Sequence, residues 1–268
     1  MGIGQEIAGD WHAALAALAW QVDLGVDEVI GDTAIDRYEL PETNRPAAPP
    51  AVAPRAPAPV MQDAPQVDPV EAARGIAARA TSLEALREAL SAFDLCDLKK
   101  GARNTVFADG NPAARVLILG EAPGREEDIE GRPFVGRAGQ LLDRMFAAIG
   151  LARTAPDAGA ALYITNVMPW RPPGNRDPEP AEVAMMRPFV ERHIALMDPD
   201  VIVVMGNTPL FALTGHKGIM RAHGTWTKAL DRPLLPMVHP AYLLRNPIAK
   251  REAWADLLSL QAHLRANG

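Results

Sequence analysis

The sequence predicts an α/β protein: a three-layer αβα sandwich around a central four-stranded parallel sheet. Beyond residue 115, short apolar runs alternate with longer segments of helical spacing, the order produced when helices connect parallel strands. Apolar residues stand next to one another in these runs rather than at every second position, which indicates strands covered on both faces. The chain has 268 residues, 48% of them hydrophobic, and can bury a core of this size.

The elements of this sheet follow one another along the second half of the chain. The predicted strands are VLILG (116–120), LYITNV (162–167), VIVVMG (201–206) and PLLPMV (233–238). The predicted helices are 138–150, 181–197, 208–215 and 250–264, the second despite an internal proline. Ligands of such sheets bind at the carboxyl ends of the strands, so the loops that follow the strands are the places to search for a site.

The first part of the chain has a different composition. Residues 1–40 form an acidic segment with one short helix predicted at 11–22, where Asp10 is placed to cap the start and one face carries Trp11, Leu15, Leu18 and Val22. Residues 41–69 contain 9 prolines and 7 alanines, a composition typical of an extended linker. We expect residues 70–268 to form the main domain, and the helix at 11–22 to dock a partner protein or to inhibit the domain.

Charge and composition limit the classes of function. The net charge of -6 divides into -8 for residues 1–70 and +2 for the rest, and residues 201–268 hold 8 bases against 3 acids, so the main domain is compatible with phosphate contacts. No apolar run reaches the roughly 20 residues of a membrane helix, and Met1–Trp11 lacks the features of a secretory signal. We therefore expect a cytoplasmic protein with no membrane partner. The single cysteine, Cys96, excludes an internal disulfide and a metal site of several thiolates.

Polar residues collect in three loops that follow predicted strands. These loops read GEAPGREEDIEGRPFVGRAG (120–139), NVMPWRPPGNRDP (166–178) and HPAYLLRNP (239–247). Each residue also has a structural explanation on its own, since Gly120 and Gly124 can form a turn, Asn166 can cap a strand and His239 can be a satisfied core histidine. Three such loops at one edge of a sheet nevertheless favour a binding site.

The order of these motifs resembles one known family. GEAPG, then ED, GRPFVG, TN, RPPGNRDP and HPAYLLRNP is similar to the uracil-DNA glycosylase superfamily, most closely its family 4, over about residues 96–260. The resemblance implies a monomeric enzyme that flips deoxyuridine out of uracil-containing DNA, hydrolyses its N-glycosidic bond and leaves an abasic site. Two alternatives stay open: a catalytically weak DNA-binding member, and a nucleotide-binding hydrolase or transferase using GEAPG, although a following GK[ST] is missing.

The chemistry of a flipped uracil assigns roles in its recognition. Phe134 supplies a stacking face, or else packs in the core. Asn166 can donate to uracil O4 and accept from N3–H, a pattern that cytosine reverses. The loop that contains Gly120, Ala122 and Gly124 brings backbone N–H groups close to the same base.

Three residues are candidates for catalysing the release of the base. His239, held extended by Pro240, can donate to uracil O2 and stabilise the negative charge of the leaving group. Some members of the family hold a water-activating Asp or Asn where this chain has Ala122. The resemblance implies that Glu121 and Glu127 line the pocket, with Glu127 either orienting water or crowding the space of thymine's methyl group. Clustered carboxylates are otherwise usually a solvated face.

Contacts with DNA are predicted for two loops. Leu243 and Leu244 can wedge into the base stack while Arg245 meets a phosphate, although one of the leucines can instead be the hydrophobic start of the last helix. Arg171 and Arg176, in the proline-rich loop, are expected to contact the backbone of the damaged strand.

The chain departs from family 4 at the iron–sulfur cluster. Family 4 members bind the cluster through four cysteines, and the matching positions here are Phe93, Cys96, Trp170 and Met186. One thiolate cannot hold such a cluster, so no iron–sulfur cofactor and no other metal site is predicted. We expect the four side chains to pack together as a hydrophobic plug, with exposure of Trp170 to DNA as the alternative.

Overall fold

A computed structural model of the protein describes residues 10–23 and 68–267, which belong to two separate compact units. The first unit contains α2 (Trp11–Asp23), the helix predicted at 11–22. Asp10 caps it, since its Oδ1 accepts from the backbone N–H groups of His12 and Ala13. Most of the predicted linker lies outside the described residues, and the division at 40 and 69 stays a prediction.

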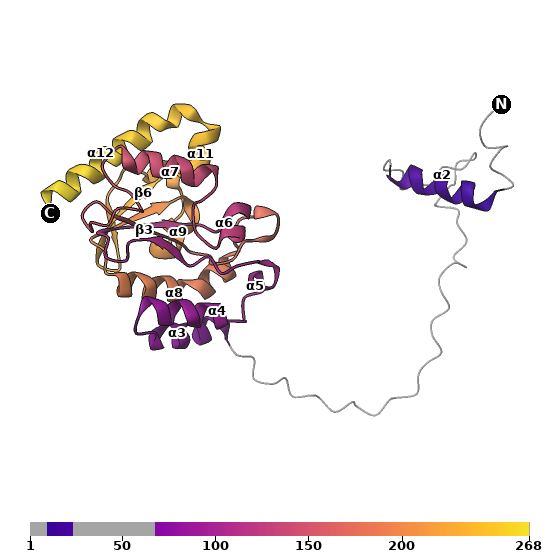
Figure 1. The fold of residues 1–268 in the computed structure, drawn as a ribbon, viewed down its shortest axis with the longest axis horizontal. Helices are drawn as coiled ribbons and strands as arrows, with labels where there is room; N and C mark the ends of the chain where they lie inside the picture. The colour runs from indigo at the N-terminus through magenta and orange to yellow at the C-terminus, as the bar shows by residue number, and fades with distance from the viewer. Residues whose placement is uncertain (1–9, 24–67, 268) are drawn as a thin grey trace, which may run out of the picture. The chain divides into compact units, whose positions relative to one another are not determined.

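The second unit is an αβα sandwich around a six-stranded sheet (Figure 1). Its strands, in the spatial order β1-β3-β2-β4-β6-β5, are β1 (Ala108–Gly110), β3 (Leu162–Asn166), β2 (Val116–Gly120), β4 (Val201–Met205), β6 (Arg232–Met237) and β5 (Thr227–Ala229). The four central strands are parallel, as predicted. The edge strands β1 and β5 are antiparallel to their neighbours and were not predicted, because three residues are too few for a periodic pattern.

Helices cover both faces of this sheet (Figure 1). They are α3 (Pro69–Arg79), α4 (Leu83–Ala92), α5 (Leu98–Gly101), α6 (Arg125–Glu130), α7 (Arg137–Ala147), α8 (Pro180–Met197), α9 (Asn207–Thr214), α10 (Ile219–Ala222), α11 (Pro240–Arg245) and α12 (Lys250–Ala266), with short 3₁₀ turns at Pro173–Asn175 and Pro247–Ala249. α8 continues through Pro188, as its apolar spacing predicted. Among the helices of the described ranges, none is long and apolar enough to cross a membrane.

Alternate residues of the central strands enter two different cores. Val116 and Ile118 pack on the side of α7 and α12, whereas Leu117 and Leu119 pack on the side of α8 and α9. α3 and α4 then pack on the outer side of α8. Both faces of the central strands are therefore buried, which explains why these strands carry no polar alternation and directs the search for a site to the strand ends.

Candidate active site

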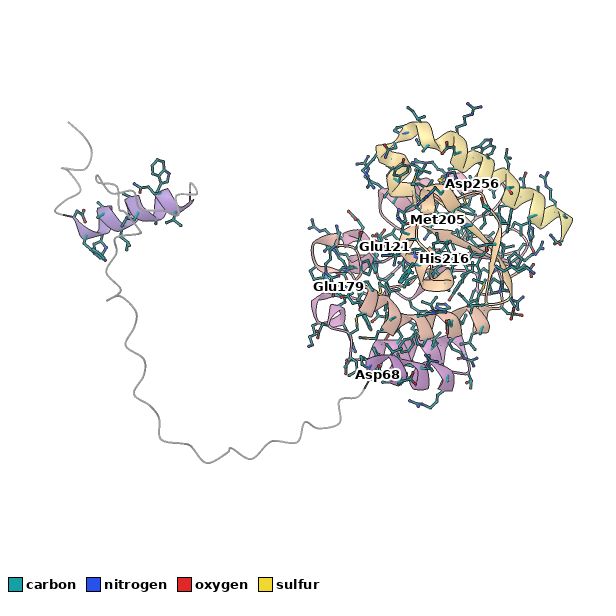
Figure 2. All side chains as sticks on the ribbon, turned by 180° about the vertical axis from the view of Figure 1, so that it is seen from behind. Asp68, Glu121, Glu179, Met205, His216 and Asp256 are labelled. Atoms are coloured by element: carbon teal, nitrogen blue, oxygen red, sulfur yellow. The ribbon has the colours of Figure 1, made fainter. Side chains whose placement is uncertain are left out.

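A cavity of about 760 Å³ opens at the carboxyl ends of β2, β3, β4 and β6. Two of its lining residues, Glu121 and Met205, are labelled in Figure 2. Nine of the predicted site residues line it: Glu121, Ala122, Gly124, Glu127, Phe134, Asn166, Arg176, His239 and Arg245. The three loops that the sequence singled out therefore meet at one site, at the edge of the sheet where a parallel arrangement places ligands.

Asn166 presents a buried acceptor with no partner. It is the last residue of β3, where it pairs with Gly120 of β2, and 7% of its surface is exposed. Its Oδ1 has no hydrogen bond with any described residue. A buried polar atom left in this state costs about 1–3 kcal/mol, which a ligand with a correctly placed N–H would recover.

Gly120 makes room for the side chains of Asn166 and Phe134. It does not line the cavity itself, but a Cβ at this position would lie 2.3 Å from Oδ1 of Asn166 and 2.5 Å from the ring of Phe134. A side chain here would therefore displace both the amide and the aromatic ring. The glycine is required by close packing rather than by an unusual backbone angle.

Phe134 is both a core residue and a wall of the cavity. It is 6% exposed and packs in the core that contains α7 and α12, and it also lines the cavity, so core packing leaves the predicted stacking role open. Its ring stacks on the imidazole of His239, with centroids 5.4 Å apart. Its backbone has a φ of +53°, a left-handed conformation that is uncommon outside glycine, and a Cβ on Gly139 would collide with its carbonyl.

His239 is held as a neutral donor. It caps α11, with Nδ1 accepting from the N–H of Ala241 at 3.1 Å. Burial lowers the pKa of His239 to about 4, and the positive charge of Arg245 adds to this effect. Because Nδ1 accepts, the single proton of the neutral ring is on Nε2, which is left to donate to a ligand.

Glu127 joins two loops of the site. Its Oε2 accepts from the N–H of Gly124 at 3.0 Å, while Oε1 accepts from those of Val135 and Gly136 at 3.0 and 2.9 Å. Three backbone donors on one carboxylate fix the GEAPG loop against the loop of Phe134. The sequence indicated water orientation or exclusion of a methyl group, and neither interpretation included this positioning contact.

Glu121 has a different environment in the same cavity. Its Oε2 accepts from the hydroxyl of Thr208 at 2.6 Å. Burial raises the pKa of Glu121, and the hydrogen bond from Thr208 partly opposes that shift. Thr208, at the start of α9, was not among the predicted site residues, because a lone threonine after a strand carries no motif.

The two leucines predicted as a DNA wedge have different environments. Leu243 is 1% exposed and packs with Leu141, Val238 and Ala253, so the prediction that it wedges into DNA is wrong. It is a core residue of α11, in line with the alternative role left open for one leucine. Leu244 is partly exposed, although neither leucine lines the cavity.

The cations around the cavity are also unequal. Arg245 is exposed and lines the cavity, whereas Arg176 lines it while pairing with Glu182 at 2.6 Å. Arg171 does not line the cavity but donates to Oδ1 of Asn175 at 2.7 Å, within its own loop. Lys217 lines the cavity and was missed by the sequence, since a lone lysine is indistinguishable from a solvated one.

The positions matched to the family's cluster cysteines do not fit an iron–sulfur group. Phe93, Cys96, Trp170 and Met186 are at most 2% exposed and belong to one hydrophobic core. Trp170 donates from Nε1 to the hydroxyl of Thr105 at 3.0 Å, so the alternative of an exposed Trp170 is wrong. Over the described ranges no group of three or more His, Cys, Asp or Glu side chains can hold a metal.

Comparison with known proteins matches this arrangement to one family. The sequence model of the uracil DNA glycosylase superfamily matches residues 107–258. Three relatives are each described as a type-4 uracil-DNA glycosylase. The protein of Thermotoga maritima is 40% identical to this chain, and the match covers 61% of this chain and 84% of the relative. The protein of Archaeoglobus fulgidus is 37% identical, with 60% of this chain and 82% of the relative covered. The protein of Saccharolobus solfataricus is 37% identical, with 68% of this chain and 87% of the relative covered. The chain therefore belongs to the uracil-DNA glycosylase superfamily.

Proposed function

We propose that the cavity binds a deoxyuridine flipped out of DNA and that the protein hydrolyses its N-glycosidic bond, releasing uracil and leaving an abasic site. Such a reaction requires a pocket that stacks the base, reads its Watson–Crick edge and stabilises the leaving group. The observation that carries the proposal is the buried, unpaired Oδ1 of Asn166, in a cavity whose walls include Phe134 and His239.

Asn166 selects uracil through its two amide atoms. Oδ1 accepts from N3–H of the base and the amide nitrogen donates to O4. Cytosine has a bare N3 and an amino group in place of O4, so both partners would be left unpaired in a buried site. Because polar atoms of both Asn166 and cytosine would then be buried without a hydrogen bond, the site should discriminate strongly between uracil and cytosine.

His239 acts on the departing base. As the glycosidic bond breaks, negative charge accumulates on uracil and is shared with O2. The Nε2–H of a neutral His239 donates to this oxygen, and the hydrogen bond strengthens as the charge develops. The depressed pKa of the ring makes it a donor of a hydrogen bond rather than of a proton.

The two carboxylates divide the remaining tasks. Glu127 positions the GEAPG and Phe134 loops, because three backbone N–H groups occupy it. In Glu121 one oxygen accepts from Thr208, and the other is left for the water that attacks the sugar. We therefore assign water orientation to Glu121 rather than to Glu127.

DNA is held at the rim of the cavity. Leu244 enters the space vacated by the flipped base, and Arg245 contacts a phosphate. Arg176 and Lys217 add positive charge beside the cavity, although Glu182 offsets the first of these. Arg171 supports the loop that carries Asn175 instead of contacting the backbone directly.

We further propose that the protein is a cytoplasmic monomer and that the helix at 11–22 binds a partner protein. We also propose that the enzyme works without an iron–sulfur cluster. The cluster proposal is supported by the buried apolar side chains at three of the four cysteine positions. Purified protein with no stoichiometric iron or sulfide, together with full activity, would agree with it. Stoichiometric iron and sulfide would contradict it.

The test of function is cleavage of a duplex oligonucleotide that contains one uracil. Incubation followed by alkali should break the uracil strand at that position and leave a cytosine control intact. Binding without alkali-labile product would favour the catalytically weak DNA-binding alternative. Hydrolysis of free nucleotides with no action on the oligonucleotide would favour the nucleotide-binding alternative.

A further inference from the structure

Arg153 is a buried cation close to the site but outside the cavity. It lies between α7 and β3, and 10% of its side chain is exposed. Nε donates to Asp143 and Nη1 to Asp109, each at 2.9 Å. Two carboxylates therefore balance the charge of this arginine, which explains how it can be buried.

The remaining donors of Arg153 are directed at the loop of Phe134. Nη1 donates to the carbonyl oxygen of Pro133 and Nη2 to that of Phe134, both at 2.9 Å. One planar guanidinium thus fixes two successive carbonyls. A lysine has a single nitrogen and cannot reproduce this set of contacts.

The clamped segment is the one with the left-handed residue. Phe134 has a φ of +53°, and its carbonyl lies directly against Gly139, where a Cβ would come within 1.7 Å of the oxygen. Such a backbone conformation persists only when its surroundings determine it. Arg153 donates to this carbonyl and Gly139 leaves room for it, and the direction of the Phe134 ring follows from this backbone.

We propose that Arg153 is a positioning residue for catalysis, acting through Phe134. By fixing the two carbonyls it holds the aromatic ring in its stack with His239. The bound base is then placed correctly relative to the imidazole. This inference rests on the proposed function. It adds a residue that lies outside the cavity and touches no substrate.

A double-mutant cycle on the full-length protein tests the coupling. The variants are R153M, R153K, F134A and R153M/F134A, measured by single-turnover cleavage of uracil duplex at saturating protein. A misplaced wall of the site should lower the rate of R153M about 10- to 100-fold. In the F134A background, R153M should change the rate less than about 3-fold, since contacting residues are not additive. R153K should not restore the parental rate.

Arg192 provides a matched control. It also clamps a backbone carbonyl with two donors, Nε and Nη2 to the oxygen of Ala80 at 2.9 and 2.7 Å, but it does so between α8 and α3. R192M should lower thermal stability and leave the single-turnover rate of the folded protein within about 3-fold of the parent. Thermal unfolding of every variant separates loss of fold from loss of positioning.

The outcomes distinguish this inference from the function on which it rests. A parental rate for R153M, or an equal loss on adding R153M to F134A and to the parent, overturns the role of Arg153. A parental rate for F134A itself instead overturns the stacking assignment. If R153M does not fold, D143A removes the carboxylate that accepts from Nε of Arg153. A parental rate for D143A, or an effect on rate that F134A fails to mask, would then contradict the proposal.

Discussion

The ring of Phe134 stacks on the imidazole of His239, with 5.4 Å between the centroids and 29° between the planes. One residue follows β2 by way of α6 and the other follows β6, so this stack joins distant parts of the chain at the carboxyl edge of the sheet. The residue proposed to hold the base and the residue proposed to stabilise its departure are thus parts of one packed unit. A change in either is expected to affect both tasks.

Asn166→Ala should lower single-turnover cleavage about 100-fold or more and reduce the preference for uracil over cytosine, because the buried pocket no longer pairs with the base edge. Asn267→Ala is the control, since this exposed amide donates only to the carbonyl of His263 near the end of the chain. Cleavage by N166A at the parental rate would contradict the assignment of the base-reading residue.

Gly120→Ala should abolish most activity while the protein stays folded. The added methyl group would lie 2.3 Å from Oδ1 of Asn166, and both recognition side chains would have to move. Gly101→Ala is the matched control, since a Cβ there meets nothing within 4 Å. Cleavage rates, with circular dichroism to confirm the fold, test the pair. Equal rates for the two variants would show that the site tolerates this displacement.

The rate of the chemical step should not follow the ordinary titration of histidine. Burial lowers the pKa of His239 from its ordinary value of 6.5 to about 4, so the ring stays neutral and active well below the pH at which a free imidazole is protonated. The unfolded state binds this proton at a higher pH than the folded state does. The free energy of unfolding should therefore fall as the pH decreases from about 6.5 toward 4. A single-turnover rate that falls with an apparent pKa near 6.5 would contradict the neutral donor, if the residual activity of H239N lacks this pH dependence.

The two adjacent leucines of α11 should separate stability from DNA contact. Leu243→Ala removes a side chain that is 1% exposed, and a cavity of this kind costs about 2–5 kcal/mol of unfolding free energy. Leu244 is partly exposed and packs against the same core, so Leu244→Ala should cost less, about 1 kcal/mol. It should slow cleavage of uracil in duplex DNA more than in single strands, where no stack has to be opened. An equal effect on both substrates would exclude the wedge.

The sequence predicted the parts of the fold whose evidence is local. Apolar residues are consecutive in the four central strands, and this pattern needs no knowledge of the neighbours. The edge strands could not be predicted, since Ala-Asp-Gly and Thr-Lys-Ala become strands only by pairing with β3 and β6. Tertiary contacts determine such short segments.

In the site as well, residues within local motifs could be predicted, and residues that act through tertiary contacts could not. Asn166 and His239 could be found because the first lies near the end of a predicted strand, the second follows one, and each is part of a motif. Arg153 could not, because its function depends on two carbonyl oxygens and two carboxylates from separate segments of the chain. Nor could sequence decide between Leu243 and Leu244, since only the packing of the helix leaves Leu243 fully buried and Leu244, against the same core, partly exposed.

The central claim is that this cavity releases uracil from DNA, and the most direct measurement is the free base itself. Duplex DNA carrying a single labelled uracil, incubated with the full-length protein, should yield free uracil and an equal amount of abasic sites, and N166A should yield neither at a comparable rate. Intact uracil DNA after prolonged incubation with folded protein that binds it would contradict the account.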